Sequence, residues 1–285
     1  MANSFDSGLV AATIARETLT VLGNKLQKLS LFSTDFSQEV RKPKDTIQVA
    51  IASGTNSTVI NPTSFTPPPE STVGKTTVEL NHVAQFYGIS QADLALGHRL
   101  EQLVRINAQA FADKIWQLAI TDVTIANFGA AASDGTDLAP GEAGLKALWT
   151  AVSKADAKGL VLDAAGYSEL IPTSSESLNL SSGAYGFDNG VHYATNWLAG
   201  ETGLEGFACS KDAIAIAAAA PAIDPSVSQN FYSQEVITLE ALGLSVYSNV
   251  VGDVSTRSVT ASLEVMFGAK AAVTDGTMAL VVSAA

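Results

Sequence analysis

The feature that most constrains this chain is a helical pattern that continues over residues 90–129. Apolar side chains recur there at steps of three and four residues, which is the spacing of one helix face. They are Leu96, Leu100, Leu103, Phe111, Ile115, Leu118 and Ile125. Ser90 is a good N-cap, Gly129 a good stop, and Glu101 and Arg105 have the spacing of an ion pair within one helix. At 1.5 Å per residue, a helix of this length spans on the order of 50–60 Å, so we expect the fold to be built along it.

Two strands with a long excursion between them precede this helix. In TIQVAIASG, Ile47, Val49 and Ile51 alternate with polar or small residues, which is the strand period. Alternation returns in TTVELNHVAQF, where it predicts one apolar face made of Val78, Leu80, Ala84 and Phe86. The residues between, 53–76, include four prolines. Connections of this length are uncommon inside compact domains, so we expect an arm that lies on a neighbouring subunit.

The stretch VGKTT at 73–77 resembles the second half of a phosphate-binding loop. The full signature, G-x-x-x-x-G-K-[ST], wraps phosphates in successive backbone N–H groups. Here the first glycine is replaced by Pro69, and Pro67, Pro68 and Pro69 have no N–H to donate. The sequence therefore predicts no nucleotide site, and it predicts that Lys75 is an exposed or intersubunit cation.

The remaining segments predict a mixture of helices and strands. We expect a helix at 7–22 that Asp6 or Ser7 caps and Gly23-Asn24 ends, followed by a polar extended arm at 33–46. We expect a helix over EAGLKALWTAVSKADAKG, and a strand, a turn and a helix over LVLDAAGYSELI. We expect a buried strand or short helix over CSKDAIAIAAAA and a strand over LGLSVYSNVV. The tail alternates at Val259, Ala261, Leu263, Val265 and Phe267, and Asp275-Gly276 then predicts a hairpin.

The motifs of common enzymes are missing from the sequence. We place His82 on the apolar face of a strand, His98 on the long helix and His192 in a loop, and none has the spacing of a metal site. Cys209 has no partner and reads as a small core residue. We therefore assign no catalytic residue, no cofactor site and no metal site. The long irregular region 172–206 carries Tyr185, Phe187, Tyr193 and Trp197.

Composition favours a chain whose surface is covered by other protein. Charged residues make up 15% of the chain, against roughly 25% in an ordinary domain, and depletion of charge is typical of protein–protein contact cores. The net charge of −12 argues against a nucleic-acid reader, whose surface would be basic. Residues 1–44 have six basic and four acidic side chains, a balance of +2, which leaves −14 for residues 45–285. The longest apolar run, at 213–223, contains Pro221 and is too short to span a bilayer.

The order of these elements resembles the major capsid (coat) protein of tailed bacteriophages, which has the Hong Kong 97-like fold. Within that family the chain is most similar to the coat proteins of short-tailed phages. The matching pieces are the segment 1–44, the extended loop at about 46–86 and the long helix at about 90–127. The run GFACSKDAIAIAAAAP and the ending SLEVMFGAKAAV…GTMALV resemble the family's closing pattern of strand, glycine and strand. The resemblance covers nearly the whole chain.

The resemblance implies an α+β fold divided into five parts. These are an N-terminal arm at 1–44, an extended β-hairpin loop at 45–88, a peripheral domain with a spine helix at 89–140, an axial α/β domain at 141–252, and closing strands of the peripheral domain at 253–285. A chain of 285 residues has little room for the extra inserted domain of some short-tailed-phage coats.

The resemblance also implies a structural protein and not an enzyme. Its copies would assemble as hexamers and pentamers into an icosahedral shell around phage double-stranded DNA, held without sequence-specific binding and without a membrane. Scaffolding, portal and decoration proteins would be separate partners, and the shell would form in the host cytoplasm as the capsid of the virion. The candidate intersubunit contacts are Arg41, Lys42, Lys44, Pro67, Pro68, Pro69 and Lys75.

Two alternatives remain at the level of the sequence. An encapsulin-like bacterial compartment shell would have the same fold with a cargo enzyme inside. A hydrolase or other enzyme would use the aromatic region 172–206 to line a small-molecule site, and it would run as a small oligomer that turns over a substrate.

Overall fold

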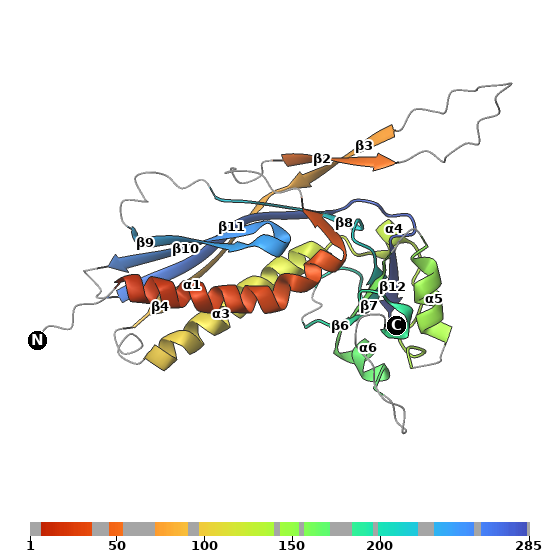
Figure 1. The fold of residues 1–285 in the computed structure, drawn as a ribbon, viewed down its shortest axis with the longest axis horizontal. Coiled ribbons are helices and arrows are strands. Elements are labelled where there is room, and N and C mark those ends of the chain that lie inside the picture. The colour runs from red at the N-terminus through yellow and green to blue at the C-terminus, as the bar shows by residue number, and fades with distance from the viewer. Residues whose placement is uncertain are drawn as a thin grey trace, which may run out of the picture.

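A computed structural model describes most of the chain and shows two β-sheets joined through one core (Figure 1). The residues described are 7–35, 46–53, 72–90, 97–139, 143–153, 157–171, 184–195, 199–221, 231–253 and 258–283. The candidate contacts Arg41, Lys42, Lys44, Pro67, Pro68 and Pro69 lie outside these residues.

The large sheet has six strands, and its longest member is β11 (Ser258–Ala271). The strand order is β1 (Ser33–Asp35), β8 (Ile214–Ala219), β11, β10 (Leu244–Asp253) and β9 (Phe231–Leu239), with β4 (Asn81–Ile89) on the other side of β11. Within β11, Ala261, Leu263, Val265 and Phe267 are all buried, because alternate side chains of a strand share one face. The alternation predicted for the tail is confirmed.

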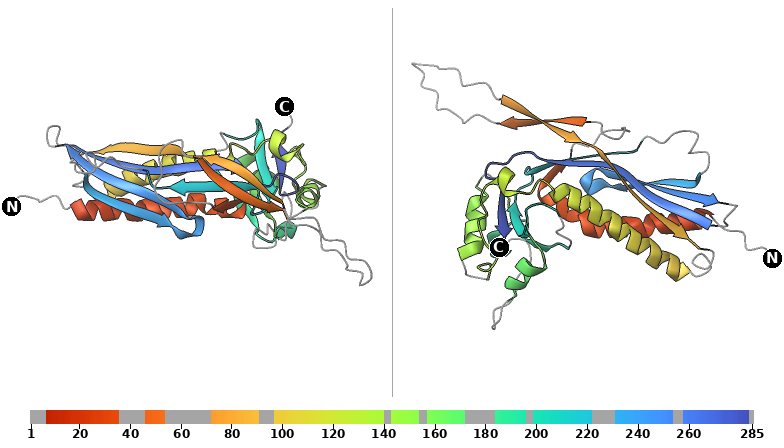
Figure 2. Two further views of the ribbon diagram at one scale, coloured as in Figure 1. Left: turned by 90° about the horizontal axis from the view of Figure 1, so that it is seen from above. Right: turned by 180° about the vertical axis from the view of Figure 1, so that it is seen from behind.

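Two helices cover one face of the large sheet. These are α1 (Ser7–Leu26), which continues into the 3-10 helix η1 (Gln27–Leu31), and α3 (Gly97–Ile120). Figures 1 and 2 show them side by side beneath the strands. Their inward side chains, among them Ile14, Leu22, Val104 and Ile115, belong to the same core as β11. We call the opposite face of the sheet, turned away from α1 and α3, its distal face.

The N-terminal segment is part of the body over the residues described. Leu26, Leu29 and Phe32 are fully buried, and β1 pairs in parallel with β8. The prediction of a separate arm over 1–44 is therefore wrong for residues 7–35. The predicted helix end at Gly23-Asn24 is also wrong, since α1 continues to Leu26. Burial of Leu22 and Leu26 against the sheet offsets the roughly 1 kcal/mol by which a glycine weakens a helix.

The long helix is shorter than its periodicity predicts. α3 ends at Ile120, and a turn at 121–124 leads into α4 (Ile125–Phe128). Asp122 ties this turn to the end of β11, because its carboxylate accepts the N–H of Ala271 at 3.0 Å and pairs with Lys270 at 3.1 Å. The 24 residues of α3 span roughly 36 Å at 1.5 Å per residue.

The first two predicted strands form a ribbon that projects from the large sheet. β2 (Thr46–Ser53) and β3 (Thr72–Glu79) pair with each other in antiparallel register. The VGKTT stretch lies in β3, where Gly74 is opposite Ile51 and Lys75 opposite Ala50. Its backbone is thus extended and paired with β2, and it does not form the loop that would cradle a phosphate. The side chain of Lys75 is not among those described.

The ribbon is anchored on the distal face of the large sheet. Ile47, Val78 and Leu80 pack there against a small cluster of alanines on β8 and Met266 of β11. Gly268 permits this close approach, since a Cβ at that position would lie 2.2 Å from the backbone oxygen of Glu79.

The sequence predicts one apolar face that the ribbon shares with the strand after it, and this shared face is not formed. Leu80 separates β3 from β4, and burial changes phase at this break. In β4 the buried residues are Val83, Tyr87 and Ile89, whereas Phe86 is 63% exposed. The prediction that Val78, Leu80, Ala84 and Phe86 share one face is therefore wrong for Phe86. A break of one residue between two strands reverses which side chains point inward.

The small sheet has four strands in the order β12 (Met278–Val282), β7 (Leu204–Cys209), β5 (Gly159–Leu162) and β6 (Val191–Tyr193). On one face lie α5 (Ala143–Ala151) and α6 (Ala164–Glu169), with their own core. The other face joins the core of the large sheet, where the ring of Phe32 makes edge-to-face contacts with Trp116 and Phe207. Two short 3-10 helices, η2 (Ala184–Gly186) and η3 (Glu240–Leu242), complete the described elements.

The predicted hairpin at Asp275-Gly276 and the predicted domain boundaries do not match the sheets. Gly276 has a positive φ of 69° as a turn requires, but β12 pairs with β7 and not with β11. The segment 141–252, predicted as one domain, contributes β8, β9 and β10 to the large sheet. The segment 253–285 contributes β11 to the large sheet and β12 to the small one.

Candidate intersubunit surfaces

The histidines and the cysteine do not form a catalytic or metal site among the residues that the structure describes. No group of three potential metal ligands is found in that part of the chain. His82 lies on the distal face with Glu264, so its predicted place on the apolar face is wrong. His192 is in the short strand β6, not in a loop, and contacts the carbonyl of Asn189 at 2.7 Å. His98 lies in the first turn of α3, on the long helix as predicted, but its side chain is not described.

Cys209 is a core residue, as the sequence predicts. It is fully buried at the end of β7, and this burial raises the pKa of its thiol well above the usual range. A thiolate is the reactive form of cysteine, so this side chain is not suited to act as a nucleophile.

The aromatic residues of the region 172–206 do not surround a common cavity where they are described. Phe187 is fully buried in the core under α5 and α6. Tyr185 is partly buried against the same core, and Tyr193 packs edge-to-face on Tyr167 with ring centroids 5.4 Å apart. Trp197 lies outside the described residues. Nothing in this arrangement supports the enzyme alternative.

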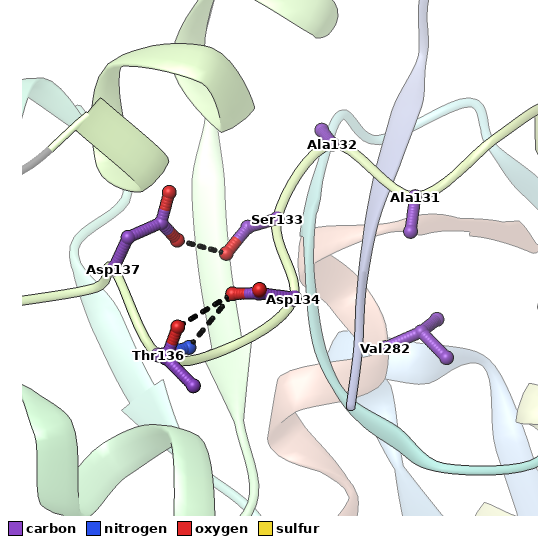
Figure 3. A pocket seen from close by; sticks show the side chains of 7 residues that line it. All are labelled: Ala131, Ala132, Ser133, Asp134, Thr136, Asp137 and Val282. Atoms are coloured by element: carbon purple, nitrogen blue, oxygen red, sulfur yellow. Dashed lines mark hydrogen bonds between the residues drawn. The ribbon is translucent and has the colours of Figure 1, made fainter. Parts of the chain in front are cut away.

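A shallow cavity of about 360 Å³ lies instead beside the β12 edge of the small sheet. Apolar side chains of Ala131, Ala132 and Val282 line one part of it, and Ser133, Asp134, Thr136 and Asp137 line the rest. Figure 3 shows Ser133 and Asp137 turned toward each other, and Asp134 turned toward Thr136. The loop is held to the sheet by backbone bonds from Ala132 to Leu280 and from Val282 to Ser133.

The charge around this cavity is negative. Hydrogen bonds from Thr136 lower the pKa of Asp134, which keeps its carboxylate ionised at neutral pH. The carboxylate of Asp137 accepts a hydrogen bond from Ser133 at 2.6 Å. Close by, Glu205 has a raised pKa because of partial burial and repulsion by neighbouring carboxylates, including Asp163 and Asp134. A cationic partner at this edge would relieve that repulsion.

A hydrogen-bonded row of polar side chains crosses the distal face of the large sheet. Gln234 on β9 donates to Asn249 on β10 at 3.0 Å, and Asn249 donates to Glu264 on β11 at 3.1 Å. Glu264 also accepts from Ser262 and meets the Nε2 of His82 on β4 at 3.1 Å. These bonds join four strands of the sheet through side chains, and Asn249 at the centre of the row is fully buried.

The ion pairs of the two long helices connect α1 to α3. Arg105 contacts Glu17 at 2.9 Å, and Arg16 contacts Glu101 at 3.0 Å. The predicted pairing of Glu101 with Arg105 within one helix is therefore replaced by pairs between helices. Lys25 also reaches Asp113 at 3.0 Å. These contacts brace the N-terminal helix on the body.

Solved structures of a virus-like particle and of a capsid share this arrangement of elements. The virus-like particle from Pyrococcus furiosus matches with a TM-score of 0.58 and 11% identity, over 95% of this chain and 98% of that one. The capsid of an empty GTA particle computed with C5 symmetry matches with a TM-score of 0.52 and 12% identity, over 87% of this chain and 88% of that one. A structure from Gordonia phage Cozz matches with a TM-score of 0.51 and 12% identity, over 92% and 87%.

The chain has the Hong Kong 97-like capsid fold. No model of a known protein family and no curated protein matches its sequence. At this level of identity the shared feature is the fold, so the functional surfaces of a capsid-fold chain must be read from its own residues. None of the helices described is long and apolar enough to cross a membrane.

The structure describes only part of the set of contacts that the sequence predicts. Of the predicted contacts, Lys75 is placed on the projecting ribbon, and the other six lie outside the described residues. Sequence analysis missed Trp149, which is 45% exposed on α5, and Asp134 beside the cavity.

Proposed function

We propose that this protein is the structural shell subunit of a tailed-phage capsid, which self-assembles into a closed icosahedral particle around double-stranded DNA. The observation that carries the proposal is the shared fold, which extends over nearly all of this chain and nearly all of the Pyrococcus furiosus virus-like particle subunit. A match over whole chains favours a common role as a building block more than a match over one domain would.

The proposed place of each part in a capsomer follows the family resemblance. The lobe built on the large sheet, with α1 and α3, is peripheral, and the lobe built on the small sheet is axial in pentamers and hexamers. The ribbon of β2 and β3 projects from the peripheral lobe (Figure 1), and Lys75 on β3 contacts an adjacent subunit together with the prolines at 67–69. Arg41, Lys42 and Lys44 are further candidate contacts between copies.

The negative net charge of the chain supports enclosure of DNA without tight binding to it. Phosphate binding requires cations, whereas residues 45–285 carry a balance of −14. The chain therefore makes the wall of the container. Scaffolding, portal and decoration functions would come from separate proteins. The assembled product is the capsid of the virion.

The test is assembly of the purified protein. We expect light scattering and negative-stain electron microscopy to show closed shells, or capsomers that close into shells when conditions or a scaffolding protein are supplied. A protein that stays monomeric under all salt, pH and scaffold conditions would contradict the proposal.

The content of the particles distinguishes a capsid from a compartment shell. Particles isolated from the native source should protect double-stranded DNA against nuclease. Particles that instead contain a tightly held enzyme and no protected DNA would favour an encapsulin-like compartment.

A further inference from the structure

Trp149 is an exposed aromatic side chain that the protein holds in one position. Its indole N–H donates to the carbonyl of Gly186 at 2.8 Å, and the ammonium group of Lys158 lies 3.7 Å from the ring centroid. The same ammonium group donates to the carbonyl of Trp149 at 2.6 Å. Despite these contacts, 45% of the residue remains exposed. A fixed, exposed tryptophan loses little conformational entropy on contact, and tryptophan is enriched at the centres of protein interfaces.

The loop that holds Trp149 is locally strained. Tyr185 has a positive φ of 51°, and Gly186 follows with a φ of 84°. A positive φ is uncommon for a bulky residue, and such strain is concentrated at functional positions. Here it turns the carbonyl of Gly186 to the indole edge.

The cavity lies beside the β12 edge of the small sheet, and the tryptophan is bonded to the loop that precedes β6. The cavity includes Val282 of β12, which is one edge strand. Trp149 is bonded to Gly186, a few residues before β6, which is the other edge strand. Gly144, near the start of α5, is bonded to Asp137 of the cavity, and Trp149 lies near the end of the same helix. A subunit with complementary features on two different surfaces can make head-to-tail contacts, and repeated head-to-tail contacts close into rings.

The two edges also differ in charge. The buried Lys158 lies beside Trp149, and Asp188 is the acid near Lys158. Lys146 is exposed on α5, one turn before Trp149. The cavity edge has Asp134, Asp137 and Glu205. A chain with a net charge of −12 repels its own copies, so a contact between copies is favoured where a local cation meets a local anion.

We infer that Trp149 of one copy docks into the cavity beside β12 of the next copy, with Lys146 facing Asp134. The occupant is a second copy of this chain. The inference rests on the proposed function, because it names one contact through which the copies of a capsomer are joined. The cavity volume of about 360 Å³ lies at the low end of the roughly 300–1,000 Å³ typical of pockets that bind small molecules.

Single substitutions test the two halves of this contact separately. Trp149→Ala removes the docking side chain, and Ala131→Arg fills the cavity from an exposed wall position. We expect each to raise the subunit concentration needed for assembly roughly tenfold or more, as measured by sedimentation velocity. Val236→Ala is the matched control, since Val236 is 56% exposed on β9 of the large sheet, and it should leave that concentration unchanged. Circular dichroism checks that each variant is folded.

Mixing the two variants tests whether the contact is head-to-tail. The Trp149→Ala copy keeps an open cavity, and the Ala131→Arg copy keeps its tryptophan. In a mixture, the tryptophan of the second variant can therefore dock into the cavity of the first, which gives one intact contact per pair. We expect mixed dimers and no rings. Formation of rings or shells at wild-type concentrations by either variant alone would overturn the inference.

Charge reversal gives an independent measurement if Trp149→Ala does not fold. Lys146→Glu and Asp134→Lys should each weaken assembly, and the double variant should recover it at least in part. Asp134→Asn, which keeps an acceptor for Thr136, should weaken assembly less than Asp134→Lys. Failure of the double variant to recover any assembly would contradict the pairing. If the wild-type protein assembles and none of these variants differs from it, this inference fails while the proposed function stands.

Discussion

At the scale of single residues, Gly268 is where the projecting ribbon meets the body. The backbone oxygen of Glu79 lies only 2.2 Å from the place a Cβ would occupy, and a methyl group of Val78 only 2.8 Å from it. Neither neighbour is a flexible side-chain end, because one is backbone and the other is a fully buried valine. An alanine at this position must therefore push the base of the ribbon away from β11.

Gly268→Ala is expected to destabilise the unassembled subunit by about 1–3 kcal/mol, the usual cost of overpacking a core. Urea denaturation followed by circular dichroism measures it. Gly88→Ala is the matched control, since it is also a β-strand glycine but has open space around the position of its Cβ, and it should change stability by less than about 0.5 kcal/mol. Equal effects of the two substitutions would show that the close approach at Gly268 is unimportant.

At the scale of elements, the docking of α1 on α3 combines apolar burial with charge. The side chain of Glu17 is only 10% exposed, and it contacts both Arg105 and Arg16. The hydrogen bond from Arg105 is the main cause that lowers the pKa of Glu17. A carboxyl group whose pKa is lower in the folded state stabilises the fold above its unfolded pKa, and this contribution is lost as the pH falls through the folded value.

Glu17→Gln should therefore reduce the free energy of unfolding at pH 7 by about 1 kcal/mol, a modest value because both arginines are more than half exposed to solvent. The difference from wild type should shrink as the pH falls below about 4, the unfolded range of a glutamate. Urea denaturation across this pH range measures it. Glu101→Gln, whose side chain is 43% exposed, should cost less at every pH, and a pH-independent effect of Glu17→Gln would refute the role assigned to its charge.

At the scale of the whole molecule, the ribbon divides into an anchored base and a tip. The base contributes Ile47, Val78 and Leu80 to a cluster on the distal face of the large sheet. The segment between the strands, with Pro62, Pro67, Pro68 and Pro69, lies outside the described residues. If that segment contacts a neighbour, its contribution to stability exists only in the assembled particle.

Replacing residues 55–70 with a short Gly-Ser linker leaves β2 and β3 in place and removes all four of these prolines. The thermal unfolding of the unassembled subunit should shift little, because the anchor at the base is kept. Particles should fail to form, or should dissociate at lower denaturant, since prolines reduce the entropy lost when a segment docks. Circular dichroism on subunits and sedimentation on particles must use the same variant. An unfolded subunit would place this segment in the core, and shells of unchanged stability would make it dispensable.

The sequence by itself determined the features that depend on local pattern. The strands β2 and β10, the two-residue alternation of β11, the amphipathic character of α3 and the burial of Cys209 are confirmed. Asp163 caps α6 by accepting the N–H of Gly166, at the turn predicted between strand and helix. Period and capping are properties of neighbouring residues, so they can be read without knowing the rest of the fold. The order of these elements was also enough to predict a capsid fold, which the comparisons with solved structures support.

The tertiary structure alone decided which elements meet and where they end. α1 continues through Gly23 because Leu22 and Leu26 are buried, and α3 ends at Ile120, where Asp122 ties the following turn to β11. The sheet partner of β12 is β7, far away in sequence, and not the adjacent β11. Likewise, only tertiary contacts form the cavity beside β12 and bond the exposed Trp149 to Gly186 in the loop before β6. Such pairings depend on contacts between distant segments, whose free energies no local pattern encodes.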